Sequence, residues 1–132
     1  MDARELLGIA RVERHKAYCP YSNYQVGAAV LSESGEVFGG CNIENCNYGG
    51  SVCAERVAIL KCISTGARKI KKLAVVIEEG RQAKPCGFCR QVMAEFATPD
   101  FELILAWDNE EYIVLTLDEI LPFAFKPDDL EM

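Results

Sequence analysis

Thiols and a carboxylate gather in two short segments of this sequence, Cys53–Arg56 and Pro85–Gln91. Cys86 and Cys89 lie three positions apart, so a single helical turn would direct both sulfur atoms to the same side. Cys53 can supply a third sulfur atom from the other segment. Three protein ligands with an open fourth position are typical of a catalytic zinc site, whereas four ligands are typical of a structural site. The spacing therefore predicts one Zn²⁺ per chain, bound so that water can reach it.

Glu55 follows Cys53 by two positions and could move protons beside the metal without binding it. A Glu that is not a ligand, together with a Pro-Cys-x-x-Cys segment and a third thiolate, is the pattern of zinc-dependent base deaminases. We therefore predict hydrolytic deamination, in which Glu55 takes a proton from water, delivers it to the ring nitrogen and later protonates the leaving ammonia. An exposed acid that complements the helix dipole is the alternative role for Glu55.

The charges of this predicted site call for a nearby cation. One Zn²⁺ and three thiolates sum to −1, which weakens the acidification of bound water. Both cysteine segments are expected at helix N-termini, where the dipole and free N–H groups lower the pKa of a thiol. Arg56 and Arg90 are candidates to donate hydrogen bonds to the thiolates. We name Arg56 as the compensating residue, although the sequence leaves Arg90 open and a surface salt bridge is the alternative for either.

The hydrophobic pattern predicts an α/β protein in which helices cover one sheet. Expected helices are residues 3–17, 53–64, 87–97 and 118–121, and expected strands are residues 25–32, 36–42, 70–77, 101–107 and 111–116. A turn at Ser34-Gly35 separates the first two strands, which should pair antiparallel. The later strand–helix–strand crossovers imply parallel pairing, and the apolar strand 70–77 should be central. The length of 132 residues fits a single domain spanning 1–132.

Charge and composition argue against several classes of function. The formal net charge of −6 disfavours nucleic acid as a partner, because binding to phosphates requires a basic face. No apolar run approaches the ~20 residues that span a bilayer, and the N-terminus lacks the layout of a signal peptide. We therefore expect no membrane partner and a cytoplasmic location. The seven cysteines are an odd number, unlike a secreted disulfide framework, and those outside the predicted site are expected to be small buried hydrophobes: Cys19, Cys41, Cys46 and Cys62.

Nearly the whole chain resembles one known family, the small homotetrameric zinc-dependent cytidine deaminases. The resemblance covers both cysteine segments and, around them, Pro20–Ser22, Val26–Ala29, Gly40–Asn45 and Leu121–Phe125. It implies a three-layer cytidine-deaminase-like fold, with a five-stranded mixed sheet and helices on both faces. It also implies conversion of free cytidine and deoxycytidine to uridine and deoxyuridine, in a homotetramer whose active sites are shared between subunits.

The resemblance also implies a set of substrate-binding residues: Asn42, Glu44, Tyr24, Ala54 and Phe125. Asn42 and Glu44 would bind the ribose hydroxyls; their spacing puts both on one face at a strand end, and turn chemistry is the alternative. The family usually has Phe where this chain has Tyr24, which would pack on the pyrimidine while its hydroxyl finds a partner. Phe125 would reach into a neighbouring subunit's pocket, whereas without the resemblance it would be an ordinary core residue.

Other interpretations remain open at this point. Deaminases of blasticidin-type nucleosides share the zinc segments but lack the ribose-binding pair at positions 42 and 44. A non-catalytic zinc module that binds protein partners would need a fourth protein ligand. A thiol redox protein would use Cys86 and Cys89 without metal, which leaves Cys53 and Glu55 unexplained. Polynucleotide cytosine deaminases typically have His in place of Cys53.

Overall fold

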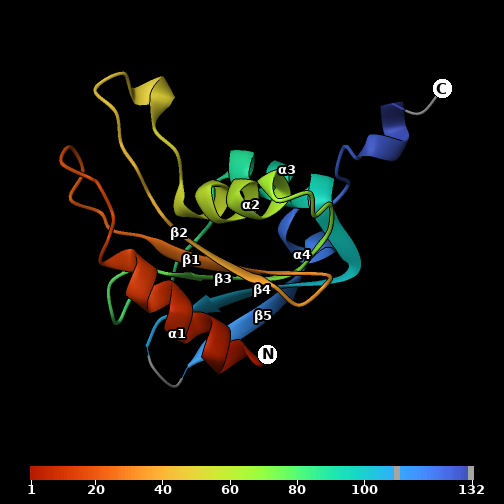
Figure 1. The fold of residues 1–132 in the computed structure, drawn as a ribbon, viewed down its shortest axis with the longest axis horizontal. Helices are drawn as coiled ribbons and strands as arrows, with labels where there is room; N and C mark the ends of the chain where they lie inside the picture. Colours follow the sequence, from red (N-terminus) through yellow and green to blue (C-terminus); the bar gives the residue numbers. More distant parts are fainter. Residues whose placement is uncertain (109–110, 131–132) are drawn as a thin grey trace.

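A five-stranded sheet lies between two layers of helices in the computed structural model, which describes residues 1–108 and 111–130 (Figure 1). The helices are α1 (Ala3–Arg14), α2 (Ala54–Ser64), α3 (Gly87–Phe96) and α4 (Leu117–Ile120). The strands are β1 (Gly27–Ser32), β2 (Val37–Cys41), β3 (Ile70–Val76), β4 (Ala97–Ala106) and β5 (Tyr112–Thr116). Short 3₁₀ helices cover Tyr48–Gly50 and Pro127–Leu130. None of the described helices is long and apolar enough to cross a membrane.

The strand order is β2-β1-β3-β4-β5, which places β3 at the centre as its apolar sequence predicted. β1 pairs antiparallel with β2 and β3, whereas β3 pairs parallel with β4, and β4 pairs antiparallel with β5. The mixed sheet is therefore confirmed, but parallel pairing in its second half is limited to β3 and β4. The reason is that α3 crosses over between these two strands, whereas β4 and β5 are joined by a short reversal of the chain.

Different helices bury the two faces of the sheet, as Figure 1 shows. On one face, Leu6 and Leu7 of α1 are fully buried against β1, β3 and β4. On the other face, Ile59 of α2 and Met93 of α3 are fully buried against the same strands. Alternate residues of β1 belong to one hydrophobic cluster or the other, because successive side chains of a strand point to opposite faces. This arrangement confirms the expected helices on both faces.

The first helix ends at Arg14, so the predicted end at residue 17 is wrong. Beyond this point the backbone N–H of Tyr18 donates to the carbonyl oxygen of Asn42 at 3.0 Å, and Tyr18 forms a β-bridge with Ile43. Pairing with this distant segment follows directly after the end of the helix. A local hydrophobic pattern carries no information about such a partner, which explains the error.

Gly40 of β2 allows α2 to lie directly on the sheet. A Cβ atom at this position would lie 2.6 Å from the nitrogen of Ala58 and 2.8 Å from the carbonyl oxygen of Ala54. Both contacts are with helix backbone, which cannot move aside as a flexible side chain could. We expect Gly40→Ala to lower the free energy of unfolding by about 1–3 kcal/mol, measured by urea denaturation.

Gly8→Ala is the matched control for this prediction. Gly8 lies inside α1, and a Cβ atom there would meet nothing within 4 Å. Alanine should therefore stabilise this helix by about 0.5–1 kcal/mol. If the two variants changed stability by the same amount and in the same direction, close packing at Gly40 would not be the constraint.

Candidate active site

The two cysteine segments are placed at the starts of α2 and α3. Cys53 is the N-cap residue of α2 and Cys86 is the N-cap residue of α3, both with extended backbone. Cys89 lies in the first turn of α3, and its backbone N–H donates to the Cys86 sulfur at 3.4 Å. All three sulfur atoms lie within 4.8 Å of one another at the starts of the two helices.

The three sulfur atoms have the spacing of a zinc site. The Sγ atoms of Cys86 and Cys89 are 3.4 Å apart, and those of Cys53 and Cys86 are 4.0 Å apart. Two thiolates bound to one tetrahedral zinc ion at ~2.3 Å would lie ~3.8 Å apart. Among the described residues, this is the only group of three or more metal-ligating side chains, and no fourth ligand joins it. The donor set therefore fits a zinc ion with an open position, and a closed four-ligand site gains no support.

Glu55 is a buried carboxyl group beside this cluster. It lies in the first turn of α2 and only 5% of it is exposed. The pKa of the Glu55 carboxyl is raised to about 7, mainly by burial and also by the negative charge of Cys53, which together outweigh the lowering effect of backbone hydrogen bonding. A group with a pKa near neutrality can both accept and donate a proton at physiological pH. An exposed acid that only complements the helix dipole is therefore not what the structure places here.

Arg56, and not Arg90, approaches a cysteine of the cluster. Its Nη2 atom lies 3.9 Å from the Cys53 sulfur and 3.3 Å from the carbonyl oxygen of Ser51. Hydrogen bonding with Cys89, assisted by Arg56, lowers the pKa of the Cys53 thiol to about 5. The same contact with Cys53, together with burial, raises the pKa of Cys89. The two thiols are therefore electrostatically coupled, with the pKa of Cys53 lowered and that of Cys89 raised.

Arg90 has a different role in the structure. Its Nε atom donates to the carbonyl oxygen of Pro85 at 2.8 Å, and its Nη1 atom donates to the carbonyl oxygen of Ile120 at 3.0 Å. These bonds fasten the loop before α3 and the end of α4 to the first turn of α3. Arg90 therefore supports the shape of the cysteine loop through backbone groups.

A cavity of about 220 Å³ opens beside Cys53, Glu55 and Cys86. Three of the residues expected to bind substrate line it: Tyr24, Asn42 and Ala54. Its wall also contains residues that the sequence did not single out: Val26, Val75, Ile77, Ala83 and Lys84. Two features of the sequence could have indicated some of these residues. Positions 75 and 77 are two apart near the end of the central strand, so both side chains point to the same face, and Lys84 directly precedes Pro85-Cys86.

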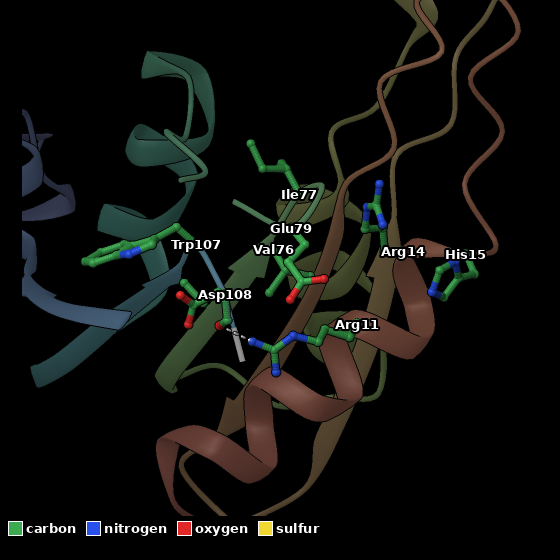
Figure 2. A pocket seen from close by; sticks show the side chains of 9 residues that line it. Arg11, Arg14, His15, Val76, Ile77, Glu79, Trp107 and Asp108 are labelled. Atoms are coloured by element: carbon green, nitrogen blue, oxygen red, sulfur yellow. Dashed lines mark hydrogen bonds between the residues drawn. The ribbon is translucent and has the colours of Figure 1, made fainter. Parts of the chain in front are cut away.

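A second cavity of similar volume, about 220 Å³, lies beside α1 (Figure 2). Arg11 donates from Nη2 to the carbonyl oxygen of Asp108 at 2.7 Å, and Arg14 donates from Nε to the carbonyl oxygen of Gln25 at 3.3 Å. The remaining lining residues include His15 and Glu79. Among the described side chains, no metal-ligating cluster borders this cavity, so it is not the candidate active site.

Comparison with known proteins agrees with this geometry. A family model described as the cytidine and deoxycytidylate deaminase zinc-binding region matches residues 1–104. The chain belongs to this deaminase family. It is 44% identical over 130 residues to a cytidine deaminase of Halalkalibacterium halodurans, covering 98% of each chain. It is 42% identical over 130 residues to a cytidine deaminase of Sporosarcina psychrophila, covering 98% of this chain and 96% of the relative.

A solved structure shows the same deaminase fold. The crystal structure of cytidine deaminase from Burkholderia pseudomallei superimposes with a TM-score of 0.88 at 42% identity, over 95% of this chain and 100% of that one. The three-layer fold expected from the resemblance is thus confirmed. Because the family model covers a zinc-binding region and the three cysteines fit the metal, the cofactor is one zinc ion per chain.

The two residues expected to bind ribose, Asn42 and Glu44, differ from each other in their positions and hydrogen bonds. Asn42 lines the cavity, where its Nδ2 atom donates to the carbonyl oxygen of Tyr24 at 2.7 Å and its Oδ1 atom accepts from the N–H of Val26 at 2.9 Å. Glu44 is not among the lining residues. Its carboxylate accepts from the backbone N–H groups at positions 21 and 22 and from the hydroxyl of Ser22. These bonds, led by that of the Ser22 side chain, lower the pKa of Glu44.

Phe125 lies outside the cavity of its own chain. It belongs to the C-terminal segment, which projects away from the sheet in Figure 1, and 56% of it is exposed. Its carbonyl oxygen accepts from Nε2 of Gln91 at 2.8 Å. The alternative role of Phe125 as an ordinary core residue of its own chain is therefore wrong.

Burial of Glu55 should lower the free energy of unfolding of the zinc-free protein to an extent that depends on pH. An acid whose pKa rises from 4.5 to about 7 on folding keeps its proton in the folded state while the unfolded chain loses it. The stability of the zinc-free protein should therefore fall as the pH rises through this range. Glu55→Gln should remove the cost and stabilise the zinc-free protein by up to about 3 kcal/mol at pH 8, and by much less at pH 5. Urea unfolding at both pH values tests this, and an equal gain at both would contradict it.

Proposed function

We propose that this chain hydrolyses free cytidine and deoxycytidine to uridine and deoxyuridine with release of ammonia. The observation that carries the proposal is the buried Glu55 carboxyl, which shares a cavity with two of three cysteines spaced for zinc. The relatives of known activity, at 42% and 44% identity over nearly the full chain, are cytidine deaminases. A single domain spanning 1–132 would carry the metal ligands and the proton carrier.

Cys53, Cys86 and Cys89 would hold the zinc ion. When bound, zinc supplies a Lewis acid that activates water for attack on the ring carbon bearing the amine. Glu55 would take a proton from the attacking water and deliver it to ring nitrogen N3. The same carboxyl would then take the second water proton from the new hydroxyl group on C4 and pass it to the departing amine. The C4 carbonyl forms as the C–N bond breaks, so that one water is consumed and one ammonia leaves. In the zinc-free chain its pKa is about 7, so neither proton state of this carboxyl is strongly favoured at neutral pH.

The cavity wall supports a nucleoside substrate. Tyr24 would face the pyrimidine ring, and Ala54, fully buried at the start of α2, would leave room for it. The amide nitrogen of Asn42 has two N–H groups, of which the contact with Tyr24 uses one. The carboxylate of Glu44 offers more acceptor sites than its bonds within the chain occupy, and a ribose hydroxyl could use them.

We also propose a homotetramer in the cytoplasm, acting in pyrimidine salvage. Support for assembly comes from apolar side chains left exposed by one chain: Leu60, Phe88, Phe123, Phe125 and Leu130. Exposed apolar side chains of this kind are stabilised when they pack against another subunit. All seven cysteines are free, which suits a reducing compartment.

Turnover of cytidine tests the proposed function directly. Purified protein is assayed by the loss of substrate ultraviolet absorbance, before and after removal of zinc by a chelator and again after zinc is restored. We expect turnover to uridine that disappears with the metal and returns with it. Folded protein that contains zinc but does not turn over cytidine would refute the proposal and direct the search to other aminopyrimidines.

Glu55→Gln separates the proton carrier from the metal site in the same assay. This variant should retain zinc, because Glu55 is not a ligand, while kcat falls by roughly 10⁴-fold or more. The expected loss is at the upper end for one acid–base group because Glu55 serves several proton transfers. Near-normal turnover by the variant would show that another group carries the proton.

Complementation between inactive chains tests the shared site. Phe125→Ala keeps Glu55, and Glu55→Gln keeps Phe125, so mixed tetramers would rebuild some intact sites. Coexpression of the two variants should therefore give more activity than the sum of the separate variants. As a control, Phe125→Ala is coexpressed with the double variant Glu55→Gln/Phe125→Ala, which supplies no intact phenylalanine. Equal activity in both mixtures would place Phe125 outside the neighbouring site.

A further inference from the structure

Polar contacts hold the Arg56 guanidinium only weakly beside the cysteine cluster. Its Nη2 atom is 3.3 Å from the carbonyl oxygen of Ser51 and 3.9 Å from the sulfur of Cys53, and both distances are long for such donors. Its Nε atom is buried and has no hydrogen-bond partner among the described residues. A long side chain loses rotamer freedom when it is fixed in one position, which these contacts offset poorly.

Phe88 supplies a stronger contact to the same group. The Cζ atom of Arg56 lies over the Phe88 ring, 4.3 Å from its centroid, well inside the ~6 Å range of a cation–π interaction. Phe88 stands between Cys86 and Cys89 in the first turn of α3. One helical turn therefore positions the ring and two sulfur atoms together, while Arg56 comes from the first turn of α2 beside Cys53.

We propose that Phe88 is a positioning residue of the zinc site, which holds the Arg56 guanidinium against the Cys53 thiolate and so slows the loss of zinc. The inference rests on the proposed function, in which these cysteines bind the metal. Three thiolates exceed the charge of Zn²⁺ by one unit, and a cation fixed near one sulfur atom offsets this excess. Without the ring, Arg56 can turn to solvent and Cys53 loses its donor.

Burial of apolar surface within one chain does not explain the position of Phe88. The residue is 64% exposed, and it lines an open groove between α2 and α3 together with Leu60, which is 51% exposed. A phenyl ring this exposed adds little to the core of one chain. Leu60 shares the groove but has no π system, so it provides a control for effects of apolar surface or subunit contact.

The test measures zinc release from intact, zinc-loaded protein into an excess of a chromophoric chelator. Phe88→Leu keeps an apolar side chain of similar helix propensity but removes the ring. We expect zinc release to become between about 2-fold and 30-fold faster, the range of a cation–π contact. Phe88→Tyr should return the rate to within a factor of about 2, because it restores the ring face. Leu60→Ala should leave the rate unchanged.

A double-variant cycle shows whether Phe88 acts through Arg56. Arg56→Ala should accelerate zinc release, and adding Phe88→Leu to it should have no further effect. Circular dichroism and sedimentation confirm that each variant keeps its fold and assembly. The proposal is overturned if Phe88→Leu releases zinc at the parental rate. It is also overturned if Phe88→Leu accelerates release equally with and without Arg56, because the ring would then act on its own.

Zinc release requires no substrate, so this test is independent of turnover. A protein with the expected release rates but no cytidine turnover would refute the proposed function and leave the role of Phe88 standing. Conversely, an active enzyme whose rate of zinc release is unchanged by Phe88→Leu would overturn only the positioning role. A folded chain that binds no zinc would contradict both.

Discussion

The structure depends on bringing three thiols and a carboxyl group together between two helix starts. All four groups carry negative charge when ionised, so their mutual repulsion opposes the arrangement unless cations and hydrogen-bond donors compensate it. The N-termini of α2 and α3 supply part of this compensation, because Cys53 and Cys86 occupy their N-cap positions. Arg56 supplies another part, and zinc would supply the largest. In the chain without metal, burial and the charge of Cys53 still raise the pKa of Glu55 to about 7, so the compensation is incomplete.

The rest of the fold serves to hold the two helix starts close together. Gly40 lets the backbone of α2 lie against β2, and the fully buried Ala54 and Ala58 keep the helix surface flat at that point. Arg90 fastens the loop before α3 to the far end of the chain through Pro85 and Ile120. These contacts are close packing at small residues and hydrogen bonds from the Arg90 guanidinium to backbone carbonyl groups. The site is therefore built on rigid elements, as proton transfer over short distances requires.

Cationic side chains lie in and near the cavity wall. Tyr24 lines the cavity, and the Arg81 guanidinium lies 5.9 Å from the centroid of its ring. Lys84 adds a cation to the wall close to Cys86. Arginine and lysine near a site with excess negative charge make its electrostatic potential less negative, and the site binds a neutral nucleoside. The ring of Phe88 acts on the other side of the cluster, through Arg56.

The sequence by itself determined the three cysteines that form the zinc site. Cys86 and Cys89 are related by one helical turn, and Glu55 follows Cys53 by two positions, so local spacing was enough to predict the metal ligands and to propose Glu55 as the proton carrier. The period-two and helical patterns likewise predicted the order of strands and helices. Tertiary structure decided everything that depends on partners distant along the chain. It ended α1 at Arg14 because Tyr18 pairs with the segment around Asn42, and it directed Arg56 to a thiolate. It also turned Glu44 toward Ser22 and left Phe125 exposed, because long-range packing and hydrogen bonding leave no periodic trace in the sequence.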